Sequence, residues 1–125
     1  MINWGQYPNF TAKEMACQHC GADGVKPELM DKLQELRIRY GKPMRITSGY
    51  RCPQHPVEAA KTVPGAHALG LAADVGAQGS EAYDVLKLAF ELGFTGIGVQ
   101  QKGSGRFIHL DVATTQLPRP TTWSY

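Results

Sequence analysis

The sequence has no apolar run long enough to cross a lipid bilayer, which needs about 20 consecutive apolar residues. Its charge is also small, because 13 Lys and Arg residues against 11 Asp and Glu residues leave a formal net charge of +2. No basic stretch alternates with aromatic residues, so neither a membrane nor a nucleic acid is expected as a partner. Internal repeats are missing as well, and 125 residues suffice for one compact domain, residues 1–125, but not for two.

Cysteine is scarce, with three residues in the chain, and an odd number cannot form a complete disulfide framework. Cys17 and Cys20 form a Cys-x-x-Cys pair with His19 between them, and Cys52 is a distant further candidate. One such pair without a matching second pair is a weak signal for a structural metal site. We expect reduced, buried thiols, with a structural metal or a disulfide to Cys52 as the alternatives.

The stretch Gly65–Val75 (GAHALGLAADV) places His67 seven residues before Asp74 among small and apolar residues. Leu71–Val75 is expected to form a strand in which Asp74 lies on the face opposite the larger apolar side chains. A carboxylate inside such a strand costs several kcal/mol unless a positive charge lies beside it. A metal ion bound by both His67 and Asp74 would supply that charge.

The stretch Phe107–Val112 (FIHLDV) alternates along its length. Its even-numbered residues are aliphatic and share the face expected on the core, so His109 and Asp111 point to the other side. His67, Asp74 and His109 together offer two imidazoles and one carboxylate, and three such ligands with one open position are the usual form of a catalytic zinc site. Iron or manganese would also accept these ligand types. The alternative for each histidine is an ordinary core or surface residue that binds no metal.

The sequence predicts three helices, each marked at its start by a capping residue or a proline. The capping box Thr11–Glu14 opens a short first helix, and a second helix runs from Pro27 to about Tyr40 and is ended by Gly41. Ser80 is expected to cap a third helix, which runs through Leu92. The apolar face of the last helix is expected to include Phe90. Residues 52–66 are expected to form a short helix or loop beside the cleft.

Strands are expected at three places: Pro43–Thr47, Leu71–Val75 and a hairpin of residues 95–100 and 106–112. The tail, residues 113–125, is expected to be irregular and packed on the body, with Trp123 and Tyr125 docked there rather than binding sugar. Because no regular βαβ alternation is visible, we expect the α+β class. The expected fold is a single small domain, with an N-terminal segment over residues 1–25, in which N-terminal helices pack on a short, mainly antiparallel sheet that bears a metal cleft.

Five motifs follow one another along the chain: SGYRC (Ser48–Cys52), GAHALGLAADV (Gly65–Val75), GIGVQ (Gly96–Gln100), FIHLDV (Phe107–Val112) and RPTTWSY (Arg119–Tyr125). In this order they resemble the successive motifs of the zinc D-Ala-D-Ala carboxypeptidase family, the LAS-type metallopeptidases that cut peptidoglycan peptides. Short phage and prophage members are the most similar, and the stretch Phe10–Cys20 also resembles their start.

The resemblance implies that His67, Asp74 and His109 bind one zinc ion and that Arg51, in the SGYR motif, binds the substrate. The residue type agrees with that role, because the planar guanidinium of arginine matches a carboxylate and cell-wall stem peptides carry several carboxylates. The alternative for Arg51 is a buried ion pair with Asp74 or Asp111.

The chain departs from the family's pattern at the general base. Many relatives carry an acidic residue three positions before the last ligand or a histidine two positions before it, where this chain has Arg106 and Phe107. We take Asp111 as the candidate base, because it shares a strand face with His109. The alternatives are that Asp111 orients His109 or pairs with Arg51. The loop after SGYR contains two weaker candidates for the base, His55 and Glu58.

The resemblance implies a monomeric zinc peptidase that hydrolyses peptide bonds in peptidoglycan stem peptides or cross-links, and a phage endolysin is one such protein. Carboxypeptidase and endopeptidase action use the same core, so both stay open. The alternative is a non-catalytic, metal-containing module that binds cell wall or serves in a phage particle. The first residues show no signal-peptide pattern, so we expect synthesis in the cytoplasm and access to the cell wall through phage lysis or virion delivery.

Overall fold

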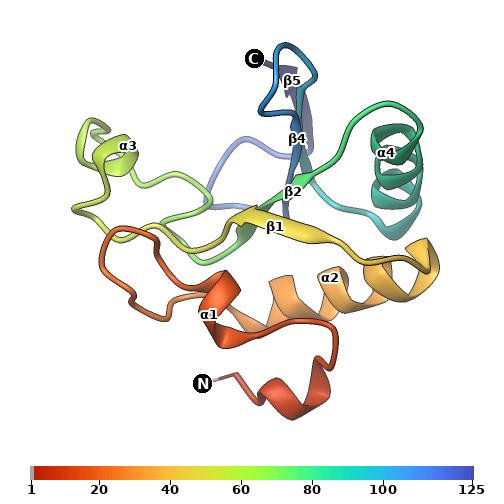
Figure 1. Ribbon diagram of the computed structural model, residues 1–125. Helices are drawn as coiled ribbons and strands as arrows, with labels where there is room; N and C mark the ends of the chain where they lie inside the picture. The colour runs from red at the N-terminus through yellow and green to blue at the C-terminus, as the bar shows by residue number, and fades with distance from the viewer. Residues whose placement is uncertain (1) are drawn as a thin grey trace.

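The chain folds as helices around a single sheet in the computed structural model, which describes residues 2–125 (Figure 1). The elements in chain order are a 3₁₀-helix η1 (Trp4–Gln6), α1 (Ala12–Met15), α2 (Pro27–Tyr40), β1 (Arg45–Ser48), α3 (Pro56–Ala59), β2 (Ala72–Gly76), α4 (Ser80–Leu92), β3 (Gly96–Gln100), β4 (Phe107–Asp111) and β5 (Thr121–Ser124). None of the helices within residues 2–125 is long and apolar enough to span a membrane.

The strands described for residues 2–125 form one sheet in the order β1-β2-β4-β3-β5. Neighbouring strands are antiparallel except for β3 and β5, which are parallel. The predicted hairpin is confirmed, with Gln100 opposite Phe107 next to the turn and Gly96 opposite Asp111 at the open end. The protein is therefore a small α+β domain with a mainly antiparallel sheet, as predicted.

The first two predicted helices begin and end through the expected backbone chemistry. The Thr11 hydroxyl accepts a hydrogen bond from the Glu14 N–H at 3.2 Å, and the Glu14 carboxylate accepts one from the Thr11 N–H at 3.0 Å. Pro27 starts α2, and Gly41 ends it with a φ of 73°. Such a left-handed residue is the common end of a helix and favours glycine.

The third predicted helix has the expected length, but two of its details were wrong. Ser80 is the first helical residue rather than the cap, and Gly79, with a φ of 61°, precedes it without a side-chain cap. Phe90 is 59% exposed, whereas the neighbouring Ala89 is fully buried. Successive helical residues point about 100° apart, so a helix that turns Ala89 to the core turns Phe90 toward solvent.

The tail contains a strand, which corrects the expectation that residues 113–125 are irregular. Thr121–Ser124 pairs with β3 as β5, and the Tyr125 N–H donates to the Val99 carbonyl at 3.3 Å. The sequence hides this strand because it is four residues long and two prolines lie just before it, which is typical of a loop or a sheet edge.

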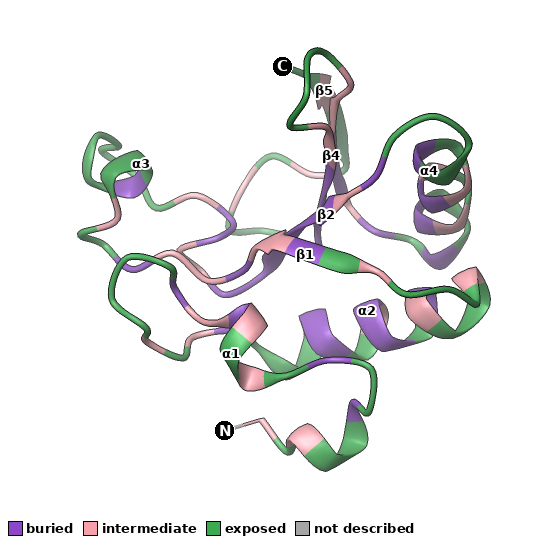
Figure 2. Ribbon diagram, viewed as in Figure 1, coloured by how far each residue is buried: buried purple, intermediate pink, exposed green. Residues whose placement is uncertain are grey.

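The sheet separates an apolar core from a polar face. Figure 2 shows that α2 and α4 turn their buried sides toward the sheet. The strand residues that meet them are at most 1% exposed, namely Ala73, Val75, Ile108 and Leu110. Because side chains alternate along a strand, Asp74, His109 and Asp111 lie on the opposite face of the sheet, away from the helices.

We expect Gly70→Ala to destabilise the fold by about 2–3 kcal/mol, measured by urea unfolding. Gly70 has a φ of 76°, which costs other residues roughly 1–2 kcal/mol, and its added Cβ would also collide with the Gly24 carbonyl oxygen. The Lys26 N–H donates to the Gly70 carbonyl at 2.9 Å and holds the two segments together. Gly103→Ala is the matched control, because Gly103 has a φ of 71° with open space around it. Equal losses in both variants would contradict the steric argument.

Candidate metal centre

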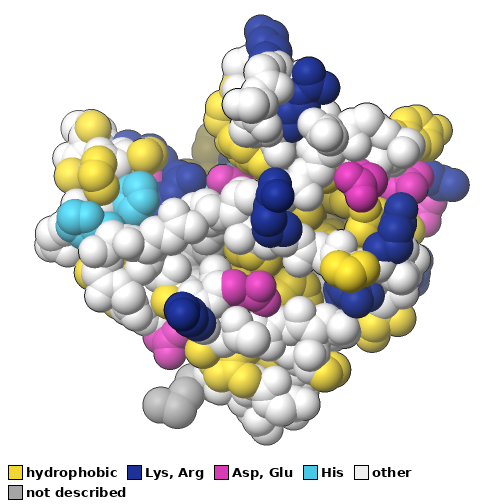
Figure 3. Space-filling view, in the orientation of Figure 1, with side chains coloured by type: hydrophobic (Ala, Val, Ile, Leu, Met, Phe, Trp, Pro, Cys, Tyr) yellow, Lys and Arg dark blue, Asp and Glu magenta, His cyan; other side chains and the backbone are white. Residues whose placement is uncertain are grey.

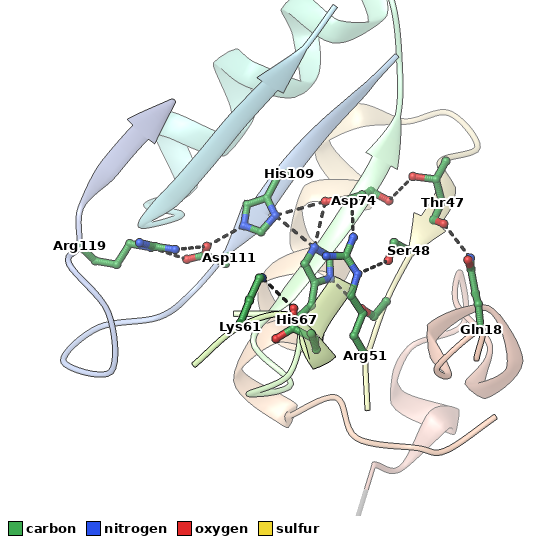
Figure 4. A network of polar contacts seen from close by, with 12 residues as sticks. Gln18, Thr47, Ser48, Arg51, Lys61, His67, Asp74, His109, Asp111 and Arg119 are labelled. Atoms are coloured by element: carbon green, nitrogen blue, oxygen red, sulfur yellow. Dashed lines mark hydrogen bonds and ion pairs between the residues drawn. The ribbon is translucent and has the colours of Figure 1, made fainter. Parts of the chain in front are cut away.

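Strand pairing brings two of the three predicted ligands together. Asp74 of β2 and His109 of β4 lie directly opposite each other in the antiparallel ladder. His67 reaches the same point from the loop that precedes β2, so the three side chains converge (Figure 4). Each of the three residues is 4% exposed, which places the centre almost entirely out of solvent.

The three converging atoms form a nearly equilateral triangle. His67 Nε2 lies 3.2 Å from Asp74 Oδ1, His109 Nδ1 lies 3.2 Å from the same oxygen, and the two ring nitrogens are 3.2 Å apart. The three atoms belong to the residues that the sequence predicted as metal ligands.

Hydrogen bonds on the far side of each ring fix which nitrogen faces this triangle. His67 Nδ1 lies 2.7 Å from the Gly49 carbonyl oxygen, which can only accept, so Nδ1 carries the proton and donates it. His109 Nε2 likewise donates to Asp111 Oδ2 at 2.7 Å. In neutral rings, His67 Nε2 and His109 Nδ1 therefore present lone pairs toward Asp74.

The charges around the triangle favour a cation there. Burial opposes ionisation of Asp74, but hydrogen bonds that His109 and His67 donate when their facing nitrogens are protonated hold the pKa of its carboxyl well below the usual range. Burial lowers the pKa of His67, which keeps that ring neutral. Burial also opposes charge on His109, yet its hydrogen bonds to Asp111 and Asp74 raise its pKa. One proton can bridge only two of the three acceptor atoms, whereas a divalent cation can satisfy all of them.

This donor set fits zinc. Two neutral imidazole nitrogens and one carboxylate oxygen are ligands that zinc accepts, and their count leaves a position for a further ligand. The partners behind the rings, a main-chain carbonyl and a carboxylate, are the kind that orient histidines toward a metal. The residues that would hold the ion are therefore His67, Asp74 and His109.

Asp111 is fully buried in an ion pair that sequence reasoning missed. Arg119 donates from Nε to Oδ1 at 2.9 Å and from Nη2 to Oδ2 at 2.7 Å, while His109 donates to Oδ2. Burial opposes ionisation of Asp111, but the hydrogen bonds from His109 and Arg119 lower its pKa to about 2. With both oxygens engaged and no exposed surface, Asp111 has the geometry of a residue that orients His109 rather than that of a base open to water.

Arg51 lies at the edge of the centre. Its Nη2 is 3.4 Å from Asp74 Oδ2, and its Nε donates to the Ser48 hydroxyl at 3.2 Å. Of the two ion pairs considered from the sequence, the structure therefore contains the one with Asp74. The Arg51 side chain is still 18% exposed, so part of the guanidinium faces solvent beside the buried ligands.

Two glycines of the GIGVQ motif explain how the tail reaches this centre. A Cβ on Gly96 would collide with the Asp111 carboxylate, and one on Gly98 would lie 2.6 Å from Trp123 Nε1. Trp123 packs with its ring centroid 4.8 Å from that of His109, so the tail residue docks on the body as predicted. Arg119 and Trp123 were missed as parts of the site, and the two glycines were the available signal for a close approach.

The two weaker base candidates are occupied by other contacts. Glu58 is buried and accepts hydrogen bonds from Lys61 at 2.7 Å and from the Gly65 N–H at 3.0 Å. His55 Nδ1 accepts from the Val57 N–H at 3.2 Å and caps α3. Both belong to the loop of residues 53–69, which lines a pocket of about 290 Å³.

Comparison with known proteins agrees with this centre. The protein-family model described as Peptidase M15 matches residues 8–111, which contain all three candidate ligands and Arg51. A comparison with curated protein sequences finds no match. The matched range covers most of the 125 residues, and it stops just before the tail that supplies Arg119 and Trp123. The chain belongs to the peptidase M15 family.

Proposed function

We propose that the protein is a zinc-dependent peptidase that hydrolyses peptide bonds in bacterial peptidoglycan, in stem peptides or in the cross-links between them. Membership of the peptidase M15 family supports peptide hydrolysis. The observation that carries the zinc dependence is the triangle of lone-pair atoms from His67, Asp74 and His109, held 3.2 Å apart by fixed ring orientations.

In this proposal, zinc supplies the chemistry, and the hydrogen-bond partners of the two histidine ligands hold the rings in the orientation that binds it. When bound, zinc supplies Lewis-acid chemistry that polarises a scissile carbonyl and lowers the pKa of a water molecule. The Gly49 carbonyl keeps the His67 proton on Nδ1, and Asp111 keeps the His109 proton on Nε2. Asp111 acts through His109 and is therefore a positioning residue.

Arg51 is proposed to bind the substrate. Its partly exposed guanidinium lies beside Asp74, within the same small volume as the ligands. A planar donor fork at this place can bind a carboxylate of a stem peptide or stabilise the oxyanion that develops during hydrolysis. Binding a substrate carboxylate there would also offset the positive charge that zinc brings into the centre.

The site of action follows from the substrate. We propose that the protein works as a monomer on the cell wall, and that phage lysis or delivery within a virion brings it there, as an endolysin would act. The aromatic side chains of Trp123 and Phe107 border the same sheet face and would contact the substrate. The wall peptides, rather than glycan sugars, are the proposed contact, because membership of the peptidase M15 family supports hydrolysis of peptide bonds.

Digestion of purified peptidoglycan tests this function. Zinc-loaded protein should release peptides from sacculi, and mass spectrometry of the products should show a single type of bond cut. Protein treated with a chelator and then desalted should release none, and added zinc should restore the release. Zinc-loaded protein that binds sacculi but releases no peptide would contradict the proposal and favour a non-catalytic wall-binding module.

A further inference from the structure

The fold gathers the three cysteines into one cluster outside the centre described above. Cys17 and Cys20 come from the loop after α1, and Cys52 comes from the segment after β1. Their three sulfur atoms lie within 4.8 Å of one another, and all three are free thiols. Four-coordinate zinc with Zn–S bonds of about 2.3 Å holds its sulfurs about 3.8 Å apart, so only a small contraction separates this cluster from a zinc site.

The loop around Cys17 already has the backbone of a thiolate site. The Cys52 backbone N–H donates a hydrogen bond to the Cys17 sulfur at 3.3 Å. The Gly21 N–H donates to the Cys17 carbonyl at 2.7 Å, and Gly21 has a φ of 76°. An N–H donor at this sulfur stabilises its anionic form, which is the form that binds metals.

The second half of the cluster repeats the spacing of the first. Cys17-x-x-Cys20 is matched by Cys52-x-x-His55, a spacing that the sequence alone did not connect because 31 residues lie between Cys20 and Cys52. His55 Nδ1 accepts a hydrogen bond from the Val57 N–H at 3.2 Å, so the neutral ring carries its proton on Nε2. Metal coordination by His55 would use the Nδ1 lone pair and would replace that hydrogen bond. Its ring centroid is 6.3 Å from that of His19, which lies inside the cysteine loop. Figure 3 shows two histidine side chains beside each other at the surface.

We propose that the thiolates of Cys17, Cys20 and Cys52 bind a second, structural zinc ion, with His55 as the fourth ligand. Three thiolates and one imidazole are a common closed set for structural zinc. The three thiol protons leave to solvent as the ion binds. The sequence favoured buried thiols, and Cys17 and Cys52 are indeed buried. The structure adds that the third thiol of the cluster, Cys20, is exposed and lies beside them.

This ion would fasten the N-terminal loop to the segment that carries Arg51. The same two segments already meet through the Tyr50 N–H, which donates to the Met15 carbonyl at 2.9 Å. Cys52 follows Arg51 directly, so a metal bond at Cys52 would fix the backbone next to the substrate-binding guanidinium. The second site is independent of the proposed peptidase activity, because none of its ligands belongs to the first.

Zinc content per chain tests the proposal. Protein purified under reducing conditions without chelator should contain two zinc ions, measured by elemental mass spectrometry. Cys20→Ser should contain one and keep the peptidase centre, and His67→Ala should contain one and keep the cysteine site. Cys20 is the chosen position because it is exposed, so its loss does not disturb the core as Cys17→Ser could. One ion in the wild-type protein, with none in His67→Ala, would overturn the second site.

Cobalt substitution identifies the ligands directly. The wild-type protein and His67→Ala should show thiolate-to-cobalt charge-transfer absorption in the near ultraviolet, and Cys20→Ser should lose it. His55→Gln should release the second ion to a competing chelator at least tenfold more readily, whereas His19→Gln, the matched control, should not. Unchanged absorption in Cys20→Ser would overturn the site, and equal behaviour of the two histidine variants would overturn His55 as its fourth ligand.

Discussion

Replacing His67 by alanine should lower kcat/KM for peptidoglycan peptides by about 10³-fold and abolish zinc binding at the first centre. The variant removes one of three ligands and leaves Asp74 and His109 with a cavity between them and the Gly49 carbonyl. Metal chemistry supplies several kcal/mol of transition-state stabilisation, and each 1.36 kcal/mol is worth a factor of ten in rate. Rates of peptide release and zinc content measured on the same preparation check this expectation.

His19→Ala is the matched control for this variant. It makes the same chemical change at an exposed histidine, so both the rate and the zinc content should stay at the wild-type level. A His67→Ala protein that is folded by circular dichroism, has lost the zinc of the first centre and still cuts peptides at the wild-type rate would show that the triangle of ligands is not the reaction centre.

Replacing Asp111 by asparagine should weaken zinc binding by about 10–100-fold and destabilise the fold by about 3 kcal/mol. The amide has nearly the same shape, but either orientation turns an NH₂ group toward Arg119 or toward the His109 Nε2–H, where the structure has only donors. Arg119 also loses its buried counter-charge, and His109 loses the acceptor that fixes its ring. Competition with a zinc-binding dye and urea unfolding measure the two effects.

The same variant separates a positioning role from a general-base role. If Asp111 orients His109, most of the lost activity should return at saturating zinc, because the defect lies in metal affinity. If Asp111 were the base, kcat at saturating zinc would stay down by about 10²–10⁴-fold while the zinc affinity changed little. Asp23→Asn, at an exposed carboxylate, serves as the control and should change neither quantity.

The ligands could be predicted from the sequence because their signal is local. Alternation along a strand places His109 and Asp111 on one face within a few residues, and the same rule places Asp74 opposite the apolar residues of β2. Helix α2, bounded by Pro27 and Gly41, was predicted for a similar reason, since caps are defined by neighbouring residues.

The supporting contacts could not be predicted, because they join segments through tertiary structure or through the main chain. Arg119 reaches Asp111 only because the tail turns back to pair with β3. The acceptor for the His67 ring is the main-chain carbonyl of Gly49. Every residue has such a carbonyl, so the sequence cannot show which one accepts this hydrogen bond. The prediction that Ala89 and Phe90 share the apolar face of α4 was wrong for Phe90, because Ala89 is fully buried and its neighbour is turned about 100° away, to 59% exposure.

Because Asp74 and His109 lie directly opposite each other, the metal centre can form only when β2 and β4 pair in the correct register. A slip of one residue between β2 and β4 would turn one of these side chains to the apolar side and place an aliphatic neighbour of His109, Ile108 or Leu110, among the ligands. Only the correctly aligned sheet brings the three ligand atoms together. Zinc therefore binds that form and stabilises it, by mass action, relative to forms in which the register of β2 and β4 has shifted. Refolding with zinc present should therefore select against misaligned molecules, and a chelator should let them accumulate.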